Sequence, residues 1–133
     1  LDIDGNDWWI WHSIERIRPR VVVVEYNASF GPERSSSVRY DPSFVRRQKH
    51  LSGYYHGASL MAFARLGKRK GYTLVSCDSS GCNAFFVRTD ALGGALKEVS
   101  PREAYYPHAK RIRERSTEEQ FAIIKDLPLE EIW

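Results

Sequence analysis

The chain has 133 residues, of which 42% are hydrophobic and 13% aromatic, and this composition suits one domain with a single core. No stretch approaches the roughly 18 consecutive apolar residues that a membrane-spanning helix needs, so we expect a cytoplasmic protein without membrane contacts. The two cysteines exclude a scaffold held by several disulfides. Cys77 and Cys82 flank the predicted turn "DSSG", where they are expected to be either reduced or linked across the turn.

The formal net charge is +3, and the positive charge is unevenly distributed. Between Pro42 and Cys77 there are seven lysines and arginines and no acidic residue. This segment predicts either a positive surface that meets an anion or a solvated helix end. No sequence in it matches a nucleic-acid-binding motif, so we do not expect nucleic acid as the partner.

The first half of the chain predicts alternating strands and helices. "LDID" is interpreted as the tail of a strand, and Asn6 or Asp7 as the cap of a helix over "WWIWHSIERI" that ends before Pro19. "RVVVVEYN" is an apolar run typical of a strand covered on both faces. About thirty irregular residues rich in Ser, Pro and Gly follow, and a loop of this length is often functional.

The second half predicts a helix over "ASLMAFARLGKRKG" and two antiparallel strands, "YTLVSC" and "NAFFVRTD". A right-handed crossover would make "YTLVSC" parallel to the valine strand, with "NAFFVRTD" inserted between them. The predicted fold is therefore α/β, a small mixed sheet with strand order first, second, fourth, third, flanked by helices. The first strand would be an exposed edge.

The C-terminal segment contains two helix starts. Ser100 and Ser116 each begin a capping box, and the second helix carries an apolar stripe that includes Phe121. The last residues, "PLEEIW", are expected to dock Trp133 on the body. We therefore divide the chain into a half-domain over residues 1–96 and a helical tail over 97–133 that packs on it.

Polar residues follow the predicted strands, and ligands bind at the carboxyl ends of strands in open α/β sheets. Asp4, Glu25 and Asn27 are oxygen ligands suited to Mg²⁺. The alternative is that the acids cap the first helix or pair with arginines. Tyr55 and His56 lie in the long loop and are the candidate catalytic residues, with His56 as a base or as a holder of a substrate hydroxyl. The candidate substrate-binding residues are Asp7, Asn27 and Asn83.

The segments "DIDGND", "PRVVVVEYN" and "GASLMAFARLGKRKGYTLVSCDSSGCNAFFVR" resemble the C-terminal half of class I S-adenosylmethionine-dependent methyltransferases of the FkbM type. The resemblance covers about residues 1–90. It implies a Rossmann-like fold that transfers a methyl group from S-adenosylmethionine to an oxygen or a similar nucleophile.

The glycine-rich loop and the ribose-binding acid of those enzymes have no counterpart in this sequence. The resemblance therefore implies a chain that does not catalyse transfer alone. We expect either the second half of a longer fold or a half-length protein, which would pair at its first strand with the missing N-terminal half or with a second copy as a homodimer.

Two other functions are open on the sequence. "DIDGN" resembles the motif of haloacid-dehalogenase-type phosphatases, which would make Asp2 the nucleophile and Asp4 the general acid, with Asn6 in place of a threonine and Ser76 as a strand-end hydroxyl. Alternatively, the chain is a binding or assembly protein that self-associates through its edge strand.

Overall fold

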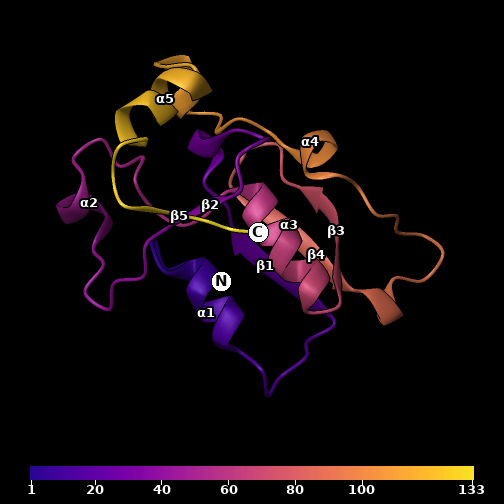
Figure 1. The fold of residues 1–133 in the computed structure, drawn as a ribbon. Helices are drawn as coiled ribbons and strands as arrows, with labels where there is room; N and C mark the ends of the chain where they lie inside the picture. Colours follow the sequence, from indigo (N-terminus) through magenta and orange to yellow (C-terminus); the bar gives the residue numbers. More distant parts are fainter.

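The computed structural model describes residues 1–133 as a small mixed α/β domain with two sheets (Figure 1). The larger sheet has the strand order β1-β4-β3 and the smaller one pairs β2 with β5. The strands are β1 (Val21–Glu25), β2 (Ser36–Val38), β3 (Tyr72–Cys77), β4 (Asn83–Arg88) and β5 (Leu129–Glu131). The helices are α1 (Asp7–Ser13), α2 (Arg46–Lys49), α3 (Leu60–Arg69), α4 (Pro101–Ala104) and α5 (Thr117–Ile124), with 3₁₀ turns η1 (Ala28–Phe30), η2 (Thr89–Ala91) and η3 (Arg111–Arg113).

Every strand pair in the two sheets is antiparallel. Strand β4 lies between β1 and β3, which is the order expected for these three segments. Because both outer strands are antiparallel to β4, they run in the same direction without pairing with each other. The predicted parallel strand pairs are therefore not present. The register places Glu25, at the end of β1, opposite Asn83.

The prediction of a strand at "LDID" is wrong. Only Leu1 pairs with β1: its amino group donates to the Val23 carbonyl at 2.6 Å, and its carbonyl accepts from the Glu25 amide at 3.0 Å. Asp4 then takes a positive φ of 56°, and the Asp7 carboxylate accepts from the Ile3 and Gly5 amides. These two bonds turn the chain away from the sheet and into α1.

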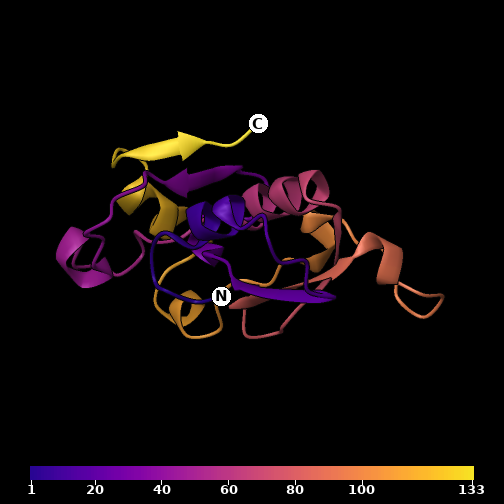
Figure 2. The ribbon, with the colours of Figure 1, turned by 90° about the horizontal axis from the view of Figure 1, so that it is seen from below.

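Helices α1 and α3 lie between the three-stranded sheet and the β2–β5 pair (Figure 2). Trp11 of α1 is the centre of the aromatic core, with its ring centroid 5.0 Å from that of Phe86 and 5.8 Å from that of Tyr72. Gly67 of α3 permits this packing, because a Cβ there would lie 2.9 Å from the Phe86 ring. None of the helices combines the length and the apolar character that crossing a membrane requires.

The first helix is shorter than predicted, ending at Ser13, and Ile17 is 65% exposed. The reason is tertiary: Ile14 is extended, and the Lys70 ammonium from the end of α3 donates to the carbonyl oxygens of His12 and Ile14. A lysine held against the last carbonyls of a helix satisfies acceptors that another turn would otherwise use.

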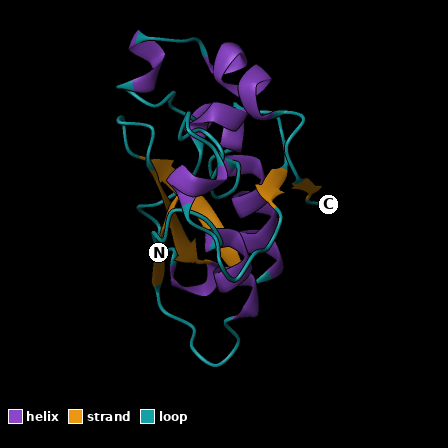
Figure 3. Ribbon diagram, turned by 90° about the vertical axis from the view of Figure 1, so that its left-hand side faces the viewer, coloured by secondary structure: helices purple, strands orange, loops and turns teal.

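Both predicted capping boxes, at Ser100 and Ser116, are present. The remainder of the tail differs from expectation, because residues after α5 form β5 and pair with β2. Trp133 is 83% exposed, so the prediction that it docks on the body is wrong, and its neighbour Ile132 is buried instead. Figure 3 shows that short helical turns and loops make up much of the chain outside the sheets.

The two cysteines are both free thiols. Cys77 is buried at the end of β3, and burial raises the pKa of its thiol to about 12. Of the two states expected for these cysteines, the structure has the reduced one.

Candidate functional site

Three titratable side chains converge at the carboxyl end of β1, and we call them the strand-end cluster: Asp4, Glu25 and His56. One ligand atom from each lies within 4.8 Å of the others. Glu25 is the last residue of β1, Asp4 belongs to the turn before α1, and His56 lies in the loop before α3. The cluster therefore joins two predicted metal ligands with a predicted catalytic residue. It reaches from the surface, where Asp4 is 58% exposed, to His56, which is 1% exposed.

Asn27 positions this cluster but is not one of its converging groups. Its amide donates to the carbonyl oxygens of Tyr54 at 2.6 Å and of His56 at 2.8 Å. Its own side-chain oxygen accepts from the Ser29 amide and caps η1. Because every polar atom of this buried amide is engaged, Asn27 fixes the loop that carries His56 rather than offering a free oxygen to a metal.

The His56 ring has one partnered and one unpartnered nitrogen. Its Nε2 lies 3.1 Å from Nη2 of Arg111. A guanidinium can only donate, so Nε2 accepts and the ring hydrogen belongs on Nδ1. That Nδ1 is buried without a hydrogen-bond partner, 3.7 Å from Oε2 of Glu25. Burial holds the pKa of His56 well below its ordinary value, so the ring is neutral at physiological pH.

The Glu25 carboxyl has an unusual pKa. Burial, reinforced by the charge of Asp2, raises it to about 7, while the Arg46 charge opposes this rise. Arg46 itself forms an ion pair with Asp4 and donates to the Gly53 carbonyl at 2.9 Å. A carboxyl that titrates near neutral pH suits either proton transfer or competition between a proton and a cation.

The other predicted site residues have structural partners. The Tyr55 hydroxyl donates to the Pro128 carbonyl at 2.5 Å and its ring packs on Phe44. Asp7 is fully buried and accepts from the backbone amides of Ile3 and Gly5 in the turn before α1. The Asn83 amide donates to Asp78 at 2.7 Å and closes the β3–β4 hairpin. In the phosphatase hypothesis Ser76 supplied a hydroxyl, which here donates to the Cys77 carbonyl at 3.1 Å.

Arg111 is the residue that the sequence did not point to. Besides His56 it contacts Asn27 at 3.1 Å and Ser29 at 3.2 Å. It lies in the tail, 84 positions beyond Asn27, in a segment that the methyltransferase resemblance does not cover. The only local signal is that it belongs to a basic run, "KRIRER", which alone is not distinct from a solvated surface.

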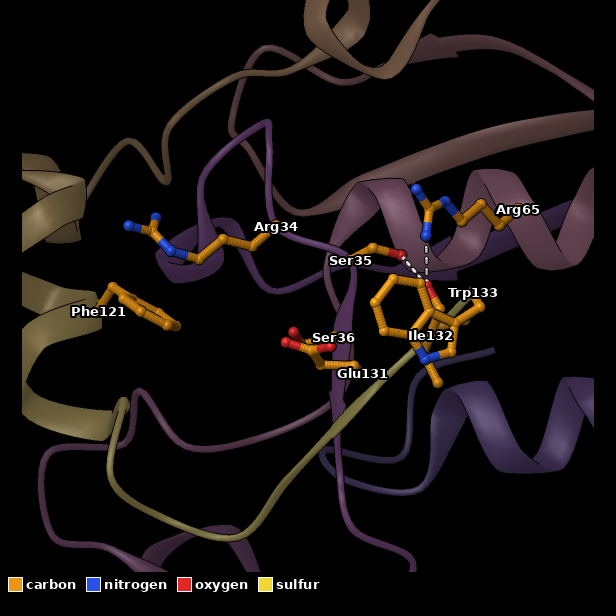
Figure 4. A pocket seen from close by; sticks show the side chains of 8 residues that line it. All are labelled: Arg34, Ser35, Ser36, Arg65, Phe121, Glu131, Ile132 and Trp133. Carbon is orange, nitrogen blue, oxygen red and sulfur yellow. Dashed lines mark hydrogen bonds between the residues drawn. The ribbon is translucent and has the colours of Figure 1, made fainter.

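The predicted basic segment does not form one surface. Lys70 binds the end of α1, and Arg65 and Arg69 of α3 donate to the carbonyls of Ile132 and Trp133. Figure 4 shows Arg65 and Ser35 meeting the Ile132 carbonyl beside a pocket of about 370 Å³. Arg46 and Arg47 lie elsewhere, next to the strand-end cluster and the tail.

Comparisons of the chain with the known protein families, with curated proteins and with solved structures gave no match. The geometry of the strand-end cluster is therefore the basis on which a function is argued.

Proposed function

We propose that the chain binds a divalent cation, Mg²⁺ or Mn²⁺, through the carboxylates of Asp4 and Glu25. In this proposal His56 donates its Nδ1–H to a water or substrate oxygen held by the ion. The observation that carries the proposal is the unpartnered, buried Nδ1 of His56, which faces Glu25 with the Asp4 carboxylate within reach. A buried N–H without an acceptor costs free energy, and a bound oxygen would satisfy it.

The ligand set favours hard cations. Two carboxylates are oxygen ligands of the kind that Mg²⁺ and Mn²⁺ take, and these ions keep several waters in their coordination shells. Direct ligation by Nδ1 would need the other ring tautomer and would set two N–H groups, those of His56 and Arg111, against each other. His56 therefore fits the role of a donor better than that of a ligand.

We further propose that the cation serves the acceptor side of a methyltransferase-like domain. The strand order β1-β4-β3, with β4 antiparallel between two strands of the same direction, supports this proposal, as do the acids at the end of β1. In the complete fold the activity would be methyl transfer from S-adenosylmethionine to a substrate oxygen: the sulfur–methyl bond breaks as the new carbon–oxygen bond forms, S-adenosylhomocysteine leaves, and the oxygen loses its proton. This chain would supply the acceptor side and would not catalyse transfer alone. The strand-end cluster would orient that oxygen and favour its deprotonation.

The first experiment is a calorimetric titration of the chain with Mn²⁺, repeated on three variants. Asp4→Asn and Glu25→Gln are expected to weaken Mn²⁺ binding on the order of tenfold or more. Asp126→Asn changes an exposed acid away from the cluster and is the matched control. Equal Mn²⁺ affinity in all four proteins, or no binding by the unmodified chain, would contradict the cation site.

The methyl-donor proposal has its own measurement. S-adenosylmethionine is titrated into the same sample with and without Mn²⁺, and binding with a 1:1 stoichiometry supports it. Absence of binding in both arms removes donor binding by this chain alone, in keeping with its missing glycine-rich loop, and leaves the cation site to be judged by the Mn²⁺ result.

Self-association is a second candidate, favoured by the outer edge of β1. Val21 and Val23 are 52% and 37% exposed, and of that edge only the end beside Leu1 is paired. An exposed apolar edge strand is a template for pairing with another copy. Light scattering is expected to give the mass of a dimer, and Val23→Lys to give that of a monomer. A monomer for the unmodified chain would end this candidate.

A further inference from the structure

We propose that the cavity between α2 and η3 is a binding site for a phosphate group, either the free ion or a phosphoester. The cavity has a volume of about 270 Å³ and lies beside the strand-end cluster. Its lining contains four cations, Arg46, Arg47, Lys110 and Arg111, and one acid, Glu114. A phosphate group here would define the substrate class of the proposed function, and its role in catalysis rests on that function. Binding of the anion itself can be measured without a metal.

The charges around this cavity are not neutralised by the protein. Among the four cations only Arg46 forms an ion pair, and its partner, Asp4, is outside the cavity lining. Arg47 donates to the Leu51 carbonyl, and Arg111 donates to the neutral groups of Asn27, Ser29 and His56. Several unpaired cations facing one cavity repel each other, and a dianion among them would reverse that repulsion.

The Arg111 side chain is fixed in position by buried polar groups. Two of its nitrogens are anchored on the buried groups behind it, and its guanidinium lies 5.8 Å from the ring centroid of Tyr54. Burial and the nearby Arg46 charge lower the pKa of the guanidinium to about 10, which leaves it protonated at neutral pH. A guanidinium that is already fixed in position, and still has free N–H donors, binds an oxyanion more tightly than a mobile one. The reason is that the entropy cost of ordering the side chain was met on folding.

The loop at Gly53 brings the backbone close to these cations. Gly53 has a φ of +70°, and a Cβ there would lie 3.3 Å from the guanidinium carbon of Arg47. Its carbonyl accepts from Arg46. A residue with a side chain would be strained in this conformation and would push against Arg47, so glycine keeps the floor of the cavity open beside two arginines.

The volume of the cavity suits a small ligand. A phosphate dianion takes up only part of about 270 Å³, so a short organic group would fit beside it. Arg111 contacts His56, and Arg46 pairs with Asp4, so the cavity is linked to the strand-end cluster through two arginines, although none of the three cluster residues lines it. The proposed anion site is therefore a neighbour of the proposed cation site, joined to it through Arg46 and Arg111.

The test is a calorimetric titration of the chelator-treated chain with inorganic phosphate and, separately, with glycerol 3-phosphate. The double variant Arg47→Gln/Lys110→Gln removes two exposed cations and is expected to weaken binding on the order of tenfold or more. Arg111→Gln is expected to do the same, and circular dichroism checks that it folds. Arg16→Gln removes an exposed cation elsewhere and is the matched control, with unchanged affinity.

The results separate the two proposals. Tighter binding of glycerol 3-phosphate than of inorganic phosphate assigns the cavity to a phosphoester, and the reverse order assigns it to the free ion. If phosphate binds but Mn²⁺ does not, the anion site stands and the cation site fails. If neither phosphate compound binds, or if Arg47→Gln/Lys110→Gln binds them as the control does, the anion site is overturned whatever the Mn²⁺ result.

Discussion

The aromatic core around Trp11 and the strand-end cluster both lie beside α3 and its preceding loop, yet they satisfy opposite demands. In the core, polar atoms have partners: the Trp8 indole donates to the Ala62 carbonyl, and the Tyr72 hydroxyl donates to the Pro19 carbonyl. In the cluster, His56 Nδ1 is the one buried side-chain polar atom of the chain that lacks a partner. The core contacts stabilise the fold, whereas the unpartnered His56 nitrogen and the buried Glu25 carboxyl reduce the free energy of unfolding and have no structural role that would explain them.

The largest effect expected from this comparison is in the core. Trp11→Ala should destabilise the chain by about 3–5 kcal/mol, because the indole is buried against Phe63, Tyr72 and Phe86. Denaturant unfolding measures the change, and Trp133→Ala, at an 83% exposed position, should leave stability nearly unchanged. Equal losses in the two variants would mean that the core is not centred on α1.

The cluster should show the opposite behaviour, a gain in stability when its charge is removed. The pKa of Glu25 is raised from 4.5 to about 7 in the folded chain, so its protonated form favours folding. That contribution is complete below pH 4.5 and is lost as the pH rises through 7. The buried His56, whose pKa is lowered, changes stability in the opposite sense, because the stability contributed by its neutral form is lost as the pH falls. With a chelator present, we therefore expect the Tm of Glu25→Gln to gain on that of the unmodified chain as the pH rises from 5 to 8, and to be the higher of the two at pH 8.

The exposed Glu15→Gln variant is the control for that pH profile, and its Tm should follow that of the unmodified chain across this pH range. A Glu25→Gln profile that coincides with the unmodified one would show that Glu25 is not the group responsible, and the distinction between core and cluster would weaken.

The smallest effect concerns Tyr55, which the sequence placed with the catalytic residues and the structure places in packing. Tyr55→Phe should cost about 0.5–1.5 kcal/mol through the lost bond to the Pro128 carbonyl. Mn²⁺ affinity should not change. Weaker Mn²⁺ binding at unaltered stability would mean that the Tyr55 hydroxyl belongs to the site, and the distinction between packing residues and site residues would not hold for Tyr55.

Local rules predicted the elements whose causes are local. The capping boxes at Ser100 and Ser116 could be predicted because each serine hydroxyl and the backbone amide that donates to it lie within three residues. The length of α1 could not be predicted, because Lys70, far along the chain, donates to the carbonyls of His12 and Ile14 at the end of the helix. For the same reason Trp133 was misplaced: β5 pairs with β2 across more than ninety positions, and that pairing buries Ile132 instead.

The sequence alone determined the apolar runs, the caps at Ser100 and Ser116, the order of the three strands in the larger sheet, and the presence of acids after the first segments. These depend on residue type and near neighbours. Only the tertiary structure decided that Asp4 and Glu25 meet His56 rather than Asn27, and that Arg111 fixes the His56 tautomer. Such contacts join loops and tail across long sequence separations. Their geometry is set by how the whole chain packs, which no local pattern records.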